Sequence, residues 1–401
     1  MRIWLLQIGE RLPGLPGVKK MRTGFLVDKL VRRGHTVVWW SSAFDHFQKA
    51  WIDSSTIKGA AGGAQLILLK GCGYQRNVSL KRYLDHRLVA HRFRAMAPQE
   101  QRPDIIVASL PAHDLAYEAV RFGAQQKIPV IVDVRDPWPD VFLSGLPPWA
   151  SLLAREALRW DYNLLKGALG GATSILACTH TFLEWALEKV NRERGPLDGV
   201  FPLGGESLVL PGSGRTYDST HPFVVAFIGT FSTFHNPEIL LECAEKMKRD
   251  NVQFVLAGDG IHLPLFRRRG AHLPHVELPG WLNDREIQTL LGRAHVGVCP
   301  SNRPASLFPN KAFTYLSGGL PILSSFDGDL RSLIERERIG FHYTPKDVAS
   351  LCRHIEFLKS NWEIYHTMSQ RARDIFETHF NVETVYNSYV DHIEHVAGKG
   401  R

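Results

Sequence analysis

The sequence predicts an α/β protein with two Rossmann-like domains, each built on a doubly wound parallel sheet and facing the other across a cleft. Short buried apolar segments alternate with helical segments along most of the 401 residues. A stretch rich in Gly, Pro and Ser interrupts this alternation, and the length exceeds that of one typical core. We therefore expect an N-terminal domain over 1–195, a linker over 196–222, a second domain over 223–380, and a C-terminal helix over 381–401 that could return to the N-terminal domain.

The charge, apolar content and cysteine pattern of the chain indicate which classes of protein and partner fit the sequence. A formal net charge of +8 and a pI of about 9.2 favour acidic partners, such as nucleotide phosphates, nucleic acid or an anionic membrane face. No apolar run reaches the roughly 18 residues that a membrane span needs, and the N-terminus has the pattern of a strand, not of a signal peptide. Five scattered cysteines without metal-ligand spacing predict free thiols in a reducing cytosol and no structural metal.

Two strand ends in the first half carry candidate site residues. The strand 2–8 leads into a glycine-containing loop over 9–17, whose spacing fits neither a dinucleotide-binding pattern nor a P-loop. The strand 130–134 runs into VDVRDPWPD, so that Arg135 and Asp136 lie where a parallel strand ends. Both a ligand site and a structural ion pair fit this cluster. A single long helix is expected over 149–169.

A basic helix over 79–96 leaves two alternatives open. Its arginines and lysine, interspersed with leucines and aromatic residues, fit contact with an anionic membrane or a lipid pyrophosphate. They also fit a surface helix with a solvated basic face. No recognised nucleic-acid-binding module is present, so we expect no nucleic acid as partner.

The segment 298–325 of the second half combines a strand end, a polar loop and a helix start. The strand stops at Pro300-Ser301, and Phe308-Pro309-Asn310 opens a helix over 311–316. Backbone N–H groups and the helix dipole make such a start a seat for phosphate. We expect Asn283, Asp284 and Glu286 to cap another helix, and Asp327-Gly328-Asp329 to be a helix cap in place of a metal-binding motif.

The order and spacing of these segments resemble a known family over about 330 residues. The matching pieces include LVRRGHTVVW, RPDIIVASLP, PVIVDVRDPWPDVF, VVAFIGTF, VQFVLAGDG, VELPGWL and FPNKAFTYLSGGLPILSS. They are similar to retaining, hexosyltransferase-like glycosyltransferases of the GT-B fold in the large family four, especially the bacterial members that build surface polysaccharides. The resemblance implies transfer of a sugar from a nucleotide diphosphate sugar to a glycan or lipid-pyrophosphate-linked acceptor, with retention and without a metal. It also implies a cytoplasmic location, with peripheral contact at the inner membrane face as the alternative.

The same resemblance assigns roles to positions of this chain. Arg135, Asp136 and Lys311 would be catalytic. The residues implied in donor binding are Gly17, Gly229, Thr230, Gly258, Gly260, Trp281, Leu282, Ser301, Ser306, Asn310 and Thr314.

Two departures from the family pattern open an alternative. Ser306 and Thr314 stand where the family usually has glutamates, and a hydroxyl lacks the charge-assisted strength of a carboxylate toward a ribose. After the first strand of the second domain, Ser232, Thr233 and His235 replace the usual basic clamp, which leaves Lys311, with Arg303 as a further candidate, to supply positive charge. The alternative is a catalytically inactive, nucleotide-binding or regulatory protein of the same fold.

Overall fold

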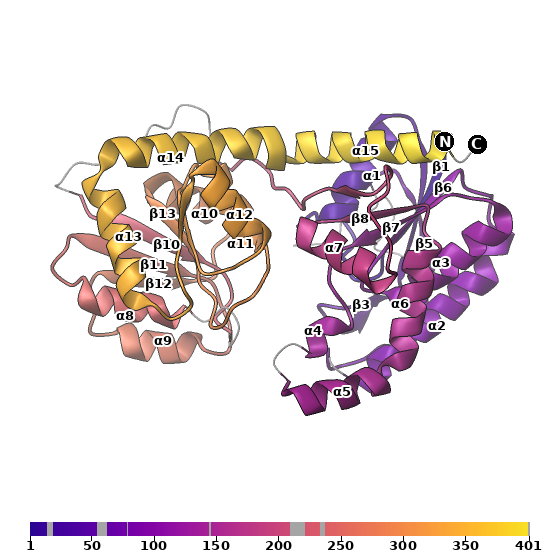
Figure 1. The fold of residues 1–401 in the computed structure, drawn as a ribbon, viewed down its shortest axis with the longest axis horizontal. Coiled ribbons are helices and arrows are strands. Elements are labelled where there is room, and N and C mark those ends of the chain that lie inside the picture. The colour runs from indigo at the N-terminus through magenta and orange to yellow at the C-terminus, as the bar shows by residue number, and fades with distance from the viewer. Residues whose placement is uncertain are drawn as a thin grey trace. The chain divides into compact units, whose positions relative to one another are not determined.

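The computed structural model describes residues 1–13, 19–53, 62–77, 79–143, 146–208, 221–232 and 237–399. It divides the chain into two compact units (Figure 1). Unit 1 comprises Met1–Pro202 together with Val385–Arg401, and unit 2 comprises Leu203–Thr384. Among the described residues, no helix has the length and apolar character that crossing a bilayer requires.

Unit 1 is built on a parallel sheet with the strand order β5-β2-β1-β6-β7-β8-β9 in its described part. The strands are β1 (Arg2–Leu6), β2 (Thr36–Ser42), β5 (Gln65–Leu69), β6 (Ile105–Ser109), β7 (Val130–Val134), β8 (Ser174–Ala177) and β9 (Gly199–Val200). A short antiparallel pair, β3 (Phe44–Asp45) with β4 (Ala50–Trp51), was not predicted.

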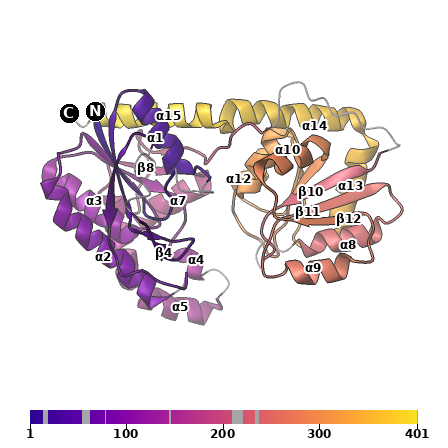
Figure 2. The ribbon, with the colours of Figure 1, turned by 180° about the vertical axis from the view of Figure 1, so that it is seen from behind.

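Helices cover both faces of the sheet in unit 1. They are α1 (Arg22–Arg32), α2 (Leu80–Met96), α3 (His113–Gln126), α4 (Asp140–Leu143), α5 (Pro148–Ala157), α6 (Arg159–Gly170), α7 (His180–Lys189) and α15 (Val382–Lys399), with a 3₁₀ turn at Ala97–Gln99. Figure 2 shows α1 beside α15, where the rings of Phe25 and Tyr386 lie 5.5 Å apart. The prediction of one long helix over 149–169 is wrong, because the backbone leaves helical geometry at Leu158 (φ −93°, ψ 11°) and separates α5 from α6.

Unit 2 repeats the architecture with a parallel sheet of order β12-β11-β10-β13-β14-β15. Its strands are β10 (Phe223–Ile228), β11 (Val252–Ala257), β12 (Val276–Gly280), β13 (Val296–Cys299), β14 (Ile322–Ser324) and β15 (Gly340–His342). Its helices are α8 (Glu238–Lys246), α9 (Leu263–Gly270), α10 (Asp284–Arg293), α11 (Asn310–Ser317), α12 (Asp329–Glu337), α13 (Val348–Ser360) and α14 (Trp362–Ile375), followed by a π-helical turn at Phe376–Phe380.

Side chains along the buried strands point alternately to the two faces of the sheet, so unit 2 has a hydrophobic core on each face. Phe223, Val225 and Phe227 of β10 point to one core, and Val224 and Ala226 point to the other. A strand buried on both faces needs helices on both sides, which is what a parallel sheet with crossover helices provides. The predicted fold class, two parallel-sheet α/β domains, is therefore confirmed for each unit.

Two predicted caps had different outcomes. Asn283 forms the predicted capping box, since its side chain accepts from the Glu286 N–H while Glu286 accepts from the Asn283 N–H. Asp327-Gly328-Asp329 lies at the predicted helix start, since Gly328 is the N-cap residue of α12 and Asp329 is in its first turn. No side chain caps the helix, because the N-cap residue is glycine, and Asp327 pairs with Arg331.

Candidate functional site

The carboxyl ends of β10, β11 and β12 in unit 2 bring glycine backbones into close contact. The Gly229 N–H donates to Ala257 at 3.0 Å, and the Gly258 N–H donates to Gly280 at 2.7 Å. Gly258 has φ +138°, and a Cβ there would lie 1.7 Å from the Gly229 carbonyl oxygen. Only glycine fits this position, so the three strand ends form a smooth edge where a ligand can approach the backbone.

Helix α11 is fixed to this edge by Tyr315. The Tyr315 hydroxyl accepts from the Ile228 N–H at 2.8 Å and donates to the Val298 carbonyl at 3.2 Å. A Cβ on Gly297 would lie 2.3 Å from the Tyr315 ring, so the glycine in VGVCPS makes room for that ring. The start of α11 is consequently held beside the ends of β10 and β13.

Lys311, in the first turn of α11, reaches the end of β10. Its Nζ lies 4.1 Å from the centroid of the Phe227 ring, and a Cβ on Gly229 would lie 2.7 Å from it. This ammonium is buried and has no hydrogen-bond partner among the described residues. Burial lowers its pKa to about 8. Since buried charges in proteins are normally paired, an ammonium without a partner in the described part of the chain is a candidate contact for an anion.

The remaining predicted residues of unit 2 lie around the same strand ends with different surroundings. Thr230, Ser306 and Asn310 are exposed, and Leu282 and Thr314 are half-buried. Trp281 follows β12 with 77% of its surface exposed. Ser301 is buried, and its N–H donates to the Ser325 hydroxyl at 2.7 Å, so it orders the loop after β13. Gly260 follows the end of β11, where a Cβ would lie 2.5 Å from the Phe231 carbonyl.

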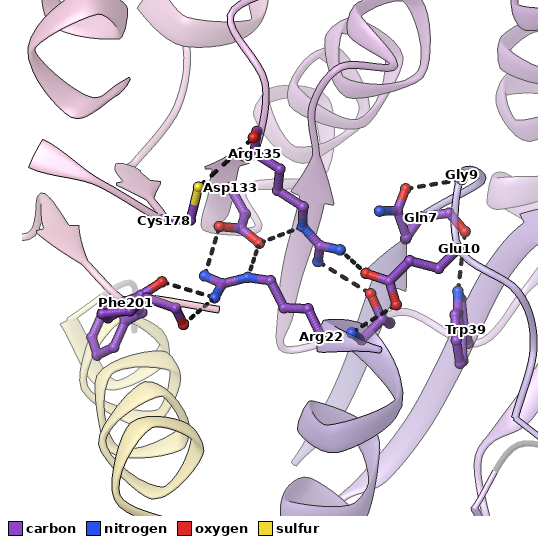
Figure 3. Close-up of polar contacts among 11 residues, drawn as sticks. Gln7, Gly9, Glu10, Arg22, Trp39, Asp133, Arg135, Cys178 and Phe201 are labelled. Atoms are coloured by element: carbon purple, nitrogen blue, oxygen red, sulfur yellow. Dashed lines mark hydrogen bonds and ion pairs between the residues drawn. The ribbon is translucent and has the colours of Figure 1, made fainter. Parts of the chain in front are cut away.

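Unit 1 has a charged network at the carboxyl ends of β1 and β7 (Figure 3). Arg22 donates to both carboxylate oxygens of Asp133 at 3.0 Å, and Arg135 donates to Asp133 at 2.9 Å and also to Glu10. Burial alone would raise the pKa of Asp133, but the two arginines hold it below its usual value. The Arg135 guanidinium is thus directed at Asp133 and Glu10. The structural ion pair that the sequence left open is present.

Asp136 follows Arg135 at the end of β7, and its pKa is shifted in the opposite direction to that of Asp133. The residue is exposed, yet surrounding protein atoms desolvate its carboxylate and raise its pKa to about 6, against the opposing effect of Arg135 and Arg82. The Arg82 guanidinium lies over Trp138 at 4.4 Å. Asp136 can therefore exchange a proton near neutral pH.

Sequence reasoning missed a small cavity in unit 1 near Arg82. Its lining includes Gln7, Ser42, His46, Tyr74, Arg82 and His86. Burial lowers the pKa of His46 to about 4 and that of His86 to about 3, so both imidazoles are neutral at physiological pH. The only signal in the sequence was the spacing of Arg82 and His86, one helical turn apart in the basic helix.

Three residues named in the sequence analysis lie outside the described structure, and one cluster of potential metal ligands was not predicted from the sequence. Gly17, Thr233 and His235 lie outside the described residues. Within the described ranges, His113, Asp114 and Asp161 form a buried group whose potential ligand atoms lie within 4.8 Å of one another.

The fold places this chain among proteins of the GT-B type. Residues 222–361, about a third of the chain and all of them in unit 2, match the family described as "Glycosyl transferases group 1". No curated protein sequence matches the chain significantly.

Solved structures match the whole chain at low sequence identity. Sucrose-phosphate synthase from Thermosynechococcus elongatus has a TM-score of 0.73 at 14% identity, covering 99% of both chains. HepE of Anabaena in complex with UDP has a TM-score of 0.69 at 15% identity, covering 98% of this chain and 99% of HepE. The lipopolysaccharide outer core galactosyltransferase WaaB has a TM-score of 0.65 at 14% identity, covering 98% and 99%. These likenesses establish a common fold.

Proposed function

We propose that this chain is a glycosyltransferase whose donor, a nucleotide diphosphate sugar, binds at the carboxyl edge of the unit 2 sheet. The observation that carries the proposal is the buried Lys311 ammonium, which has no hydrogen-bond partner in the described structure and lies beside Gly229. A diphosphate supplies the missing counter-charge. The family match of residues 222–361 and the structures of HepE with UDP and UDP-glucose support a nucleotide sugar as the donor class.

The chemistry follows from charge that develops on the leaving diphosphate. Lys311 and the first N–H groups of α11 would stabilise that charge from a preorganised position, where electrostatic stabilisation is most effective. Pro309 is the N-cap residue of α11 and offers no side-chain cap, so a ligand can take that place. Because Lys311 and these N–H groups would stabilise the charge of the leaving diphosphate, the proposed reaction needs no metal ion for that purpose. Thr314 would contact the ribose, and Trp281 would lie near the base.

The same proposal covers the stereochemistry of transfer, the acceptor and the roles of two residues of unit 1. Transfer proceeds with retention, and the acceptor is a glycan or a lipid-pyrophosphate-linked glycan in the cytoplasm. Asp136 is the proposed contact of the transferred sugar in unit 1. Arg135, whose guanidinium is directed at Asp133 and Glu10, is proposed to hold that strand end in place.

The test measures nucleotide binding and release in the full chain. Lys311→Met should abolish the thermal stabilisation by uridine, guanosine or thymidine diphosphate that the unmodified chain displays, and also the release of free nucleotide from the matching donor sugar. The matched control is Lys359→Met, because Lys359 pairs with Glu356 on α13. Diphosphate affinity should also fall above pH 8, since the anion needs the protonated ammonium. Equal nucleotide binding by Lys311→Met and the unmodified chain would refute the proposed site.

A second candidate is a nucleotide-binding protein without transferase activity. It is favoured by Ser306 and Thr314, which offer hydroxyls where the resembling family usually has carboxylates. Stabilisation by a nucleotide diphosphate that depends on Lys311, with no nucleotide release from any donor sugar in the panel, would favour this candidate over the enzyme.

A further inference from the structure

Two cysteine thiols of unit 2 meet although they are far apart in the sequence. Cys243 lies on α8 and Cys352 on α13, and 109 positions separate them in the chain. Figure 1 and Figure 2 both show α8 beside α13. The two Sγ atoms are 2.7 Å apart, which is only about 0.7 Å more than the length of an S–S bond. The pair is therefore placed for a covalent bond that joins the two helices.

The two thiols differ in their access to solvent. Cys243 is fully buried in one hydrophobic core of unit 2, and its sulfur also lies 3.7 Å from that of Met247. Cys352 packs against the edge of the same core and is half-buried. A small oxidant in the solvent therefore reaches Cys352 first, and Cys243 is the thiol that lies behind it.

The surroundings also make Cys352 the more nucleophilic of the two sulfurs. Its pKa is lowered chiefly because its sulfur accepts a hydrogen bond from the Cys243 thiol, with a further contribution from the charge of Lys246, while partial burial opposes both. The same hydrogen bond, together with burial, raises the pKa of Cys243. Since the thiolate and not the thiol is the nucleophile, Cys352 is the sulfur that attacks an oxidant.

The other three cysteines lack this arrangement. The Cys72 thiol donates to the Lys81 carbonyl at 3.6 Å, and the Cys178 thiol donates to the Arg135 carbonyl at 3.7 Å. Burial raises the pKa of Cys72, and it raises the pKa of Cys178 and of Cys299 to about 12. Within the described ranges, these three are free cysteines without a second thiol at hydrogen-bond distance. Selective oxidation is thus expected at one pair.

We propose that Cys243 and Cys352 form a site of reversible oxidation, at which a hydroperoxide converts the two thiols into a disulfide between α8 and α13. The Cys352 thiolate attacks hydrogen peroxide, so that an S–O bond forms, the O–O bond breaks and hydroxide leaves. The Cys243 thiol then attacks the sulfur of the Cys352 sulfenic acid, so that the S–S bond forms, the S–O bond breaks and the thiol proton leaves with the hydroxide as water. The two thiols lose two electrons and two protons, and the peroxide is reduced to two waters. A dithiol reductant reverses the reaction by thiol–disulfide exchange.

The disulfide would close a long segment of the chain into a loop. Cross-links between distant positions restrict the unfolded chain most, so the oxidised form of unit 2 should be the more stable one. The proposal does not depend on sugar transfer, because it rests on the contact between α8 and α13 and uses no residue of the proposed donor site.

The experiment counts the thiols of the full chain before and after oxidation. The chain is reduced with dithiothreitol, freed of reductant, treated with hydrogen peroxide and denatured for titration. The number of thiols should fall from five to three, because two of the five are consumed. The intact mass should fall by two hydrogen atoms, and proteolysis should release a peptide pair joined through Cys243 and Cys352. Oxidation should raise the Tm of the transition that includes unit 2 by at least about 4 °C, and dithiothreitol should reverse all of these changes.

Three variants test the order of the two steps. Cys352→Ser should lose both the disulfide and the rise in Tm. Cys243→Ala should stop at the Cys352 sulfenic acid, which dimedone labels. The matched control is Cys72→Ser, because Cys72 is also half-buried, and this variant should form the disulfide like the unmodified chain.

The joined peptides from the unmodified chain decide the question even where a variant fails to fold. Five thiols remaining after peroxide treatment would overturn the proposal, as would a disulfide that still forms in Cys352→Ser. Thermal stabilisation by a nucleotide diphosphate is measured separately, in the presence of reductant. A chain that binds nucleotide but forms no disulfide therefore contradicts this proposal and leaves the donor-site proposal intact.

Discussion

Replacing Lys311 should stabilise the protein while removing its capacity to bind a diphosphate. The fall in the pKa of this ammonium from 10.5 to about 8, caused by burial, corresponds to a folding penalty on the order of 3 kcal/mol. The Phe227 ring, 4.1 Å away, returns about 0.5–2 kcal/mol through attraction of the cation. We therefore expect Lys311→Met to raise the free energy of unfolding at pH 7 by about 1–3 kcal/mol.

The assay is thermal unfolding of the ligand-free chain as a function of pH. At pH 7 the variant should have a Tm about 3–10 °C higher in the transition that includes unit 2. A lysine with a lowered folded-state pKa carries its full penalty below about pH 8, and the penalty disappears as the pH rises towards 10.5. The difference between the two proteins should therefore shrink above pH 8. A variant less stable than the unmodified chain at pH 7 would refute the claim that this charge is buried without a partner.

Three other substitutions, one of them a control, test the packing of unit 2 and the buried ion pair of unit 1. Gly258→Ala should lower stability by at least about 3 kcal/mol, because its Cβ would overlap the Gly229 carbonyl. Gly292→Ala in α10, with nothing within 4 Å of its Cβ, should leave stability unchanged or raise it by up to about 1 kcal/mol in the same thermal assay. Asp133→Asn should cost about 3–5 kcal/mol, because Arg22 loses a buried counter-charge. Since the pKa of Asp133 is lowered, the stability that this carboxylate contributes is present above about pH 4 and lost in more acidic buffer, which urea unfolding of both proteins at pH 7 and pH 3 would measure.

The sequence alone was sufficient to predict those features of the fold that depend on interactions between residues close together in the chain. The capping box of Asn283 and Glu286 is a four-residue pattern, and alternating strands and helices determine the sheet class. The sequence pointed to Lys311 because this residue stands at a helix start. The sequence could not show that the Lys311 ammonium lacks a hydrogen-bond partner, because its surroundings are formed by Phe227 and Gly229 at the end of another element, β10.

The sequence was insufficient where distant segments decide the outcome. The ion pair between Arg135 and Glu10 could not be foreseen, because Glu10 lies 125 positions away in the chain; the role of Arg135 at a reacting sugar stays a prediction. Periodicity also could not reveal the break at Leu158, since neither glycine nor proline marks it. The proximity of Cys243 and Cys352 was equally hidden, because 109 positions separate them in the chain.

The route of the chain through its two units has a consequence for biosynthesis. Unit 2 is one continuous segment, Leu203–Thr384, whereas unit 1 is interrupted by it and resumes at Val385. Tyr389 of that returning segment lies under the Arg22 guanidinium at 4.9 Å. A nascent chain on the ribosome can therefore fold unit 2 before unit 1 is complete, and unit 1 acquires this aromatic cover only after Val385–Lys399 have been translated. A fragment that ends at Pro202 would leave that arginine without its aromatic neighbour.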